Sequence, residues 1–116
     1  MSSNQPRRKV EVACIKPTIQ DIAFIAGFLE GDGYFGQHRT TVTVSVIQKQ
    51  KWPLEYLQQF LGGTLGLETK QHGLSKGKSY HMWRVTGARA RGLMMTVYKF
   101  MSPERQSKIR RALYVV

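Results

Sequence analysis

The sequence predicts an α+β domain, in which one four-stranded antiparallel sheet carries helices on one face. The main evidence is the order of patterns along the chain: a helix, two strands, a helix, two strands and further helices. A second observation is the segment 41–46, where Thr and Ser alternate with Val, as in a strand with one buried face. The length of 116 residues suits one domain, which we assign to 17–116 behind a basic N-terminal arm at 1–16.

The first helix is predicted over 19–30. Thr18 is its expected N-cap, and Asp21 three positions later completes a capping-box pattern. Gly31 and Gly33 are expected to end it. Apolar residues follow helical spacing inside it: Ile22, Ile25, Ala26, Phe28 and Leu29.

The later elements follow from turn residues and periodicity. Arg39 lies between the first two strands, Pro53 opens the second helix, and Gly62 ends it. A Gly- and Lys-rich turn separates the second pair of strands, and Ser102-Pro103 separates the last two helices. The predicted strands are 34–38, 40–48, about 64–71 and 79–86, and the predicted later helices are 53–61, 88–101 and 103–115.

The chain is strongly basic. Eighteen Lys and Arg residues against seven Asp and Glu give a net charge of +11, which favours a polyanionic partner such as nucleic acid or an acidic membrane. A membrane-binding protein needs a long amphipathic basic helix, for which only the last helix is a candidate. One cysteine, Cys14, excludes an internal disulfide and a cysteine-rich zinc site. With no membrane span or secretory signal, we expect an intracellular protein.

The segment Ile25–Gly33, IAGFLEGDG, resembles the nine-residue signature of the LAGLIDADG homing endonucleases. The predicted order of elements also matches that family's αββαββα unit over about 18–113. Small residues in the motif let a second helix approach closely. With one motif in the chain, that helix belongs to a second subunit, so a two-fold homodimer is expected, although packing on the chain's own sheet is the alternative. The expected interface residues are Ile22, Ile25, Ala26, Gly27, Leu29 and Gly31.

Pairing two such helices brings two carboxylates together, where they repel unless divalent cations lie between them. Hard oxygen ligands indicate Mg²⁺, which suits phosphodiester cleavage. The resemblance implies that Asp32, at the eighth motif position, ligates metal together with the carbonyl of Gly31. Glu30 is expected to have a structural role at the helix end.

The resemblance also implies polar and basic side chains around the metal. Gln48 matches the family's glutamine, and Lys51 and Arg105 are candidates for the basic role. Each has a simpler alternative as a solvated side chain, and Glu104 departs from the family pattern beside Arg105. The predicted catalytic set is therefore Asp32, Gln48, Lys51 and Arg105.

The sheet face without helices is expected to read DNA in a major groove. Strand alternation selects most of its residues, whereas the fourth strand has aromatic residues in both phases, and there the resemblance favours Ser79 and His81 over Tyr80, Met82 and Arg84. The predicted DNA-binding residues are His38, Arg39, Thr41, Thr43, Ser45, Glu68, Lys70, His72, Ser79 and His81.

Together these features predict a Mg²⁺-dependent endonuclease that makes a staggered double-strand break in a long, pseudo-palindromic double-stranded DNA site. The resemblance adds a role in the homing of an intron or intein. The alternative is a protein of the same fold that binds DNA or RNA without cutting, as a regulator or an intron maturase. Asp32 between two glycines favours the enzyme, because a relative that does not cut has little reason to keep it.

Overall fold

A computed structural model describes residues 14–69 and 77–114. Its four-stranded sheet and its helices form the predicted α+β arrangement. Most of the predicted basic arm, and the turn at 70–76, lie outside the described residues. The helices are α1 (Ile19–Asp32), α2 (Trp52–Leu61), α3 (Gly87–Val97), the short 3₁₀ helix η1 (Tyr98–Phe100) and α4 (Pro103–Tyr114). The strands are β1 (Gly33–His38), β2 (Thr41–Gln48), β3 (Thr64–Thr69) and β4 (Ser79–Thr86).

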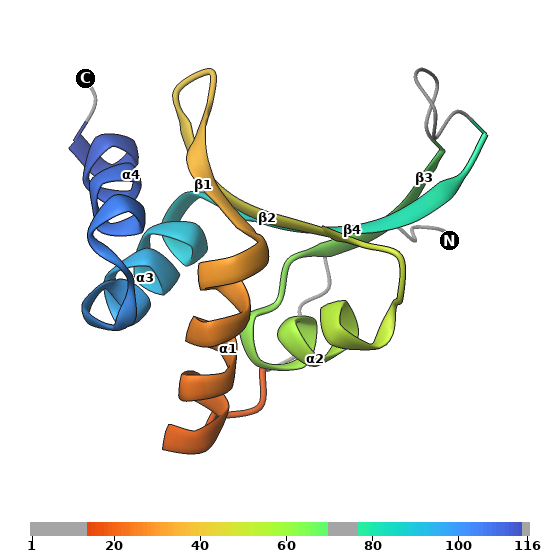
Figure 1. Ribbon diagram of the computed structural model, residues 1–116, viewed down its shortest axis with the longest axis horizontal. Helices are drawn as coiled ribbons and strands as arrows, with labels where there is room; N and C mark the ends of the chain where they lie inside the picture. Colours follow the sequence, from red (N-terminus) through yellow and green to blue (C-terminus); the bar gives the residue numbers. More distant parts are fainter. Residues whose placement is uncertain (1–13, 70–76, 115–116) are drawn as a thin grey trace, which may run out of the picture.

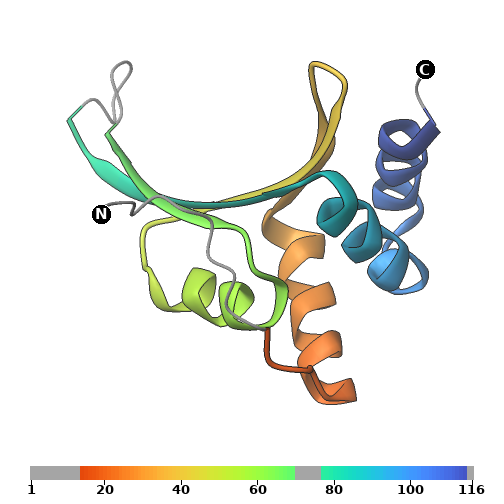
Figure 2. The same cartoon turned by 180° about the vertical axis from the view of Figure 1, so that it is seen from behind.

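All strand pairs are antiparallel, and the strand order is β1-β2-β4-β3. Figure 1 shows a strongly curved sheet, in which the β1–β2 pair and the β3–β4 pair bend away from α1 and α2. The same arrangement seen from behind places every helix on the convex side of the sheet (Figure 2). The concave side, which we call the open face, carries no helix within the described part of the chain. This confirms the predicted placement of helices on one face.

The start of α1 is fixed by the predicted capping box. The Thr18 hydroxyl accepts from the Asp21 backbone N–H at 3.1 Å, and the Asp21 carboxylate accepts from the Thr18 N–H at 2.8 Å. Tyr56 of α2 donates its hydroxyl to the same carboxylate at 2.6 Å. Asp21 therefore caps α1 and also joins it to α2.

The end of α1 differs from the prediction, since the helix continues through Gly31 to Asp32. Gly33 ends it: its N–H bonds to Leu29 O, and its extended backbone starts β1 directly. A side chain at Gly33 would place its Cβ 2.8 Å from Leu29 O, so this close approach requires glycine. Because no loop separates α1 from β1, the last residue of the helix is held against the sheet.

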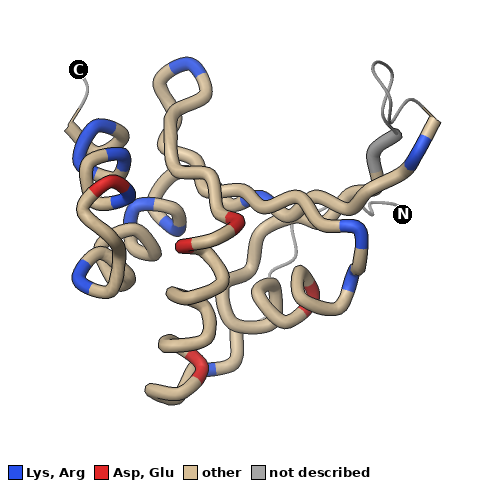
Figure 3. Tube along the Cα trace, in the orientation of Figure 1, with Lys and Arg blue, Asp and Glu red and all other residues tan. Residues whose placement is uncertain are grey.

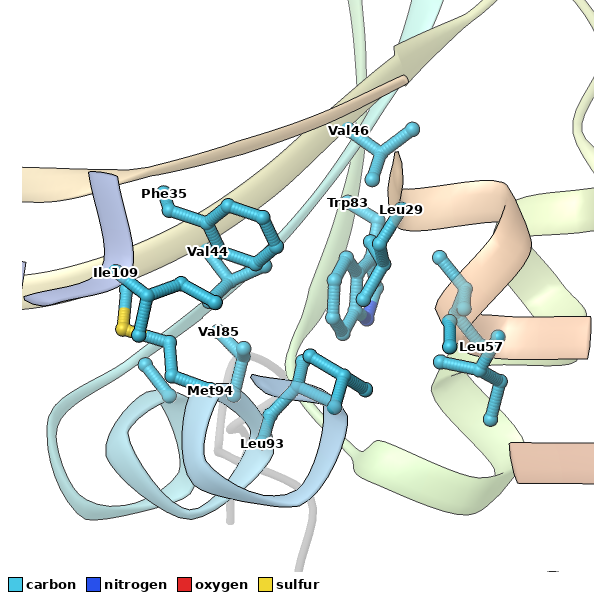
Figure 4. Close-up of a cluster of buried hydrophobic side chains, with 14 of the residues drawn as sticks. Leu29, Phe35, Val44, Val46, Leu57, Trp83, Val85, Leu93, Met94 and Ile109 are labelled. Carbon is cyan, nitrogen blue, oxygen red and sulfur yellow. The ribbon is translucent and has the colours of Figure 1, made fainter. Parts of the chain in front are cut away.

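The core lies between the convex side of the sheet and the helices (Figure 4). Trp83 of β4 is fully buried at its centre and donates its indole N–H to Gly62 O at 2.8 Å. Leu29 and Leu57 reach it from α1 and α2, and Met94 packs from α3. Burial of these side chains supplies most of the driving force for the fold.

One further element differs from the sequence prediction. The predicted helix 88–101 is divided, because α3 ends at Val97 and η1 follows. The hairpin between β1 and β2 turns at Arg39 as predicted, and its φ of +62° is unusual for a residue with a side chain.

Candidate functional site

Asp32 lies at the junction between α1 and β1, where the motif helix meets the sheet. Its side chain is exposed, and its Oδ2 accepts a hydrogen bond of 2.8 Å from Gln48 Nε2. Gln48 is the last residue of β2 and reaches Asp32 because β1 and β2 are paired, with Gly33 opposite Val46. The fold thus brings together Asp32 of the motif and Gln48, the glutamine that the family resemblance implied.

Gly31, the other predicted metal ligand, is exposed one residue before Asp32, with open space beside it. An exposed carboxylate and backbone carbonyls are hard oxygen donors, and they fit Mg²⁺ or Ca²⁺ better than zinc. Among the described residues, no three His, Cys, Asp or Glu side chains cluster as a metal site. The donors at this junction are thus one carboxylate and nearby backbone carbonyls, a set that fits a hard divalent cation.

Glu30 occupies the predicted structural position at the end of α1. Its Oε1 accepts a 3.0 Å hydrogen bond from the backbone N–H of Ser102, at the start of α4. This bond, then the Ser102 hydroxyl, lowers the pKa of Glu30 below its ordinary value, with a smaller contribution from the charge of Arg105; desolvation acts in the opposite direction. Glu30 is therefore bound to α4, and it is Asp32 that is exposed.

Arg105 lies in the first turns of α4 and points to the same junction. Its Nε donates to Glu30 O at 3.0 Å and its Nη1 donates to Gly33 O at 2.7 Å. The guanidinium also lies over the Phe35 ring, 5.8 Å from the ring centroid. Arg105 was predicted as a basic catalytic residue, and the structure places it beside Asp32 but bonds it to the backbone on either side.

Lys51, the second basic candidate, lies at the start of α2. Its ammonium forms an exposed ion pair with Glu55 of the same helix, at 3.7 Å. The fold thus joins Gln48 to Asp32 directly, brings Arg105 to the backbone around Asp32, and directs Lys51 to a carboxylate of α2.

The open face is defined by strand register. Tyr34 pairs with Ser45, and Ser45 with Arg84, so these three residues share the face opposite the buried valines. His38, Thr41 and Ser45 lie on this face as predicted, and Arg39 is exposed at the hairpin turn. Sequence reasoning did not select several other residues of this face, among them Tyr34, Ile47, Tyr80, Met82 and Arg84.

Two predictions for the open face are wrong. His81 and Ser79 are in phase with buried Trp83, so they belong to the convex side, and Tyr80, Met82 and Arg84 take the open side instead. Aromatic residues occur in both phases of β4, so only the pairing with β2 decides the face. Thr43 lies on the open side but is only 4% exposed, and its hydroxyl bonds to Thr41 O.

The third strand leaves part of the prediction untested. Glu68 pairs with Tyr80 in the β3–β4 ladder. Lys70 and His72 lie outside the described residues.

The predicted dimer surface is partly wrong. Ile25, Ala26 and Leu29 are 2%, 3% and 0% exposed because they pack into the chain's own core, so they cannot form a free surface. Ile22 is half-buried, whereas Gly27 and Gly31 are exposed as expected. The exposed side of α1 also includes Ala23 and Phe24, which sequence reasoning missed. The spacing Ala23, Gly27, Gly31 was the signal that could have located it, and we call these residues the small-residue stripe.

Charge is unevenly distributed over the molecule (Figure 3). Glu30 and Asp32 lie together at the end of α1. Basic residues lie on the sheet and beside its strands, including Arg39, Lys78 and Arg84, and also on α3 and α4. Arg84, which shares the open face with Tyr34 and Ser45, gives that face positive charge that suits a phosphate backbone.

Comparison with protein families gives one match, to the model of the LAGLIDADG-like domain, over residues 20–94. That range includes the motif, the whole sheet and most of α3. No curated protein matches the chain. Within the described residues, none of the helices combines the length and apolar character needed to cross a membrane. Since the match covers well over half of the sequence and the structure has the expected αββαββα order, the chain belongs to the LAGLIDADG family.

Proposed function

We propose that this protein is a site-specific DNA endonuclease that cuts both strands of a long, pseudo-palindromic site as a homodimer. The observation that carries the proposal is the exposed Asp32 carboxylate, hydrogen-bonded to Gln48 where α1 meets the sheet. Members of the LAGLIDADG family are homing endonucleases or related maturases, and we assign this chain to the first group.

The chemistry proposed for the site is metal-assisted hydrolysis of a phosphodiester. Mg²⁺ bound there would activate water and stabilise the leaving oxygen. Asp32 and the Gly31 carbonyl would hold the cation, with phosphate oxygens and the second subunit's Asp32 completing its ligands. The Gln48 amide would fix the orientation of the Asp32 carboxylate, as residues that support metal ligands commonly do.

The open face supports DNA binding. It is concave, and its exposed side chains combine hydrogen-bonding groups with the positive charge of Arg84. Hydroxyl, imidazole and guanidinium groups read base edges in a major groove. Proposed contacts are His38, Arg39, Thr41, Ser45, Tyr80 and Arg84, with Glu68, Lys70 and His72 retained from the sequence prediction.

The small-residue stripe supports the homodimer. Gly27 and Gly31 have no neighbouring atom within 4 Å of where a Cβ would lie, so a second α1 could approach the backbone closely. Two-fold pairing of α1 with α1 would place the two Asp32 residues near the axis. Each would then serve one DNA strand, which explains why a chain with one motif could make a staggered break.

A second function, binding of DNA or RNA without cutting, has one observation in its favour. The two basic candidates are both engaged: Arg105 bonds to backbone carbonyls, and Lys51 pairs with Glu55. A regulator or intron maturase would need no free basic group beside Asp32. The exposed Asp32 favours the nuclease, and we propose homing of an intron or intein as its biological role.

The test begins with duplexes selected from a randomised pool for binding to the wild-type protein in Ca²⁺. The selected duplex is then incubated with wild type and with Asp32→Asn, in Mg²⁺ and in Ca²⁺. We expect cutting in Mg²⁺ by wild type, slower by about 10³-fold in Asp32→Asn because several kcal/mol of transition-state stabilisation are lost. Binding without cutting by either protein would favour the regulator or maturase.

A further inference from the structure

We propose that Arg105 and Glu30 are positioning residues that hold the Asp32 backbone in place for cleavage, an inference that rests on the proposed nuclease function. Together with Ser102 they form what we call the α1–α4 clamp. The Glu30 carboxylate accepts a hydrogen bond from the N–H of Ser102, and the Arg105 guanidinium donates hydrogen bonds to Glu30 O and Gly33 O. The three contacts link the end of one helix to the start of another, more than 70 residues apart in sequence.

The clamp matches the electrostatics of both helix ends. The last four carbonyls of a helix lack partners within it, and a cation is favourable beside them. The last turn of α1 has no basic residue of its own, so Arg105 of α4 supplies the charge and satisfies Glu30 O. The carboxylate of Glu30 takes the reciprocal place, at the N-terminus of α4.

The two carbonyls held by Arg105 lie on either side of Gly31 and Asp32. Gly31 lacks a side chain and has no neighbouring atom near its missing Cβ, so its own packing does little to fix the backbone there. One rigid guanidinium fork therefore fixes the segment at both ends. A lysine ammonium is a single point donor on a flexible stem and does not reproduce this geometry.

The remaining contacts of Arg105 fix its own position. Its backbone N–H bonds to the Ser102 hydroxyl at 3.3 Å, and its guanidinium lies over the ring of Phe35, which is 4% exposed. Burial of the ring and the capped start of α4 make the clamp a rigid support. A shift of about 1 Å at a reacting group can cost on the order of 10²-fold in rate, so this support should affect cleavage.

The first test measures the backbone directly, without metal or DNA. Hydrogen exchange of the peptide that contains residues 31–33 is compared in wild type, Arg105→Met and the control Arg111→Met. Arg111 is exposed on the same helix and bonds only to Ser107 within it among the described residues. We expect exchange at least several-fold faster in Arg105→Met alone; equal protection in all three proteins would overturn the clamp.

The second test measures the single-turnover cleavage rate on the selected duplex, at a temperature where every variant is folded. We expect Arg105→Met to cut about 10²-fold more slowly and to require more Mg²⁺, with DNA affinity in Ca²⁺ changed less than threefold. Arg105→Lys should be almost equally slow. A wild-type cleavage rate in Arg105→Lys would overturn the positioning role of Arg105, since it would mean that positive charge alone is required.

A double variant shows whether Glu30 and Arg105 act together as one clamp or affect cleavage independently. Glu30→Ala should slow cleavage, and adding Arg105→Met should slow it little further, because both changes release the same segment. Additive losses would overturn a shared role. If wild type cuts no selected duplex, the nuclease proposal fails, while hydrogen exchange still decides whether the clamp holds the backbone.

Discussion

At the scale of single residues, the place of a side chain in the sequence did not by itself show which partners it has in the fold. Glu30 and Asp32 lie two residues apart and were distinguished from sequence only through the motif. The structure separates them physically, since Glu30 is bonded to α4 and Asp32 is exposed beside Gln48. The bonds of Arg105 were not predictable, because they join carbonyls of α1 and β1 to a residue more than 70 positions away.

Asp21 makes stability depend on pH. The Tyr56 hydroxyl, followed by the bonds to Thr18, lowers the pKa of Asp21 from 3.8, while the Asp21 carboxylate raises the pKa of Tyr56 from 10.0. Asp21 therefore contributes its full stabilisation of the fold at pH values above its pKa in the unfolded chain. This stabilisation is lost as pH falls through the lower pKa that Asp21 has in the folded protein. Tyr56 contributes its stabilisation at pH values below its pKa in the unfolded chain, and this is lost as pH rises through the higher pKa that Tyr56 has in the folded protein.

Replacing Tyr56 by Phe should remove the largest of these interactions. We expect the melting temperature of Tyr56→Phe to be lower than that of wild type at neutral pH, with the two curves converging below pH 3.8 and above pH 10. Circular dichroism melts from acid to alkaline pH measure both curves. Parallel curves over the whole range would show that the hydrogen bond is absent in solution.

At the scale of elements, the sequence predicted helices and strands well where a single periodicity dominates. The alternation in 41–46 identified β2 and its faces, and the Thr18–Asp21 spacing located the start of α1. The fourth strand was assigned to the wrong face, because Tyr80 and Trp83 have opposite phases and only the register with β2 separates them. For α1, the apolar pattern identified the buried face, whereas the exposed face with the small-residue stripe is assigned to the proposed dimer.

Leu29 tests which face of α1 packs inside. It is 0% exposed, so Leu29→Ala should lower the free energy of unfolding by about 2–5 kcal/mol through lost burial and a cavity. Ile19→Ala on the same helix is the control, because Ile19 is 82% exposed and its loss should change stability little. Urea denaturation followed by fluorescence measures both. A decrease in unfolding free energy below about 1 kcal/mol in Leu29→Ala would show that Leu29 is not buried in the core.

At the scale of the whole molecule, the proposed double-strand cleavage requires a second copy of the chain. One chain offers a single motif, one exposed Asp32 and one small-residue stripe, together with a concave open face. The net charge of +11 favours a nucleic-acid partner, without selecting a sequence. Dimerisation is a prediction from the sequence, and three of the residues first assigned to the interface, Ile25, Ala26 and Leu29, are buried in the chain's own core.

Gly27→Leu should weaken the dimer and leave the subunit folded. Open space surrounds Gly27, so a leucine fits one chain but would separate two paired helices, and it also favours helix formation. Gly92→Leu is the matched control, since Gly92 is an exposed helical glycine of α3 with equally open space. Sedimentation velocity should show a monomer for Gly27→Leu and a dimer for the control. A dimer for both variants would move the interface elsewhere.

The central claim is that each subunit's Asp32 cuts one DNA strand. It is tested with mixed dimers of wild type and Asp32→Asn, co-expressed with two different affinity tags, purified by both, and incubated in Mg²⁺ with a plasmid carrying the selected site. We expect the mixed dimer to convert supercoiled plasmid to nicked circles, whereas the wild-type dimer produces linear DNA. Linear product from the mixed dimer at the wild-type rate would contradict it.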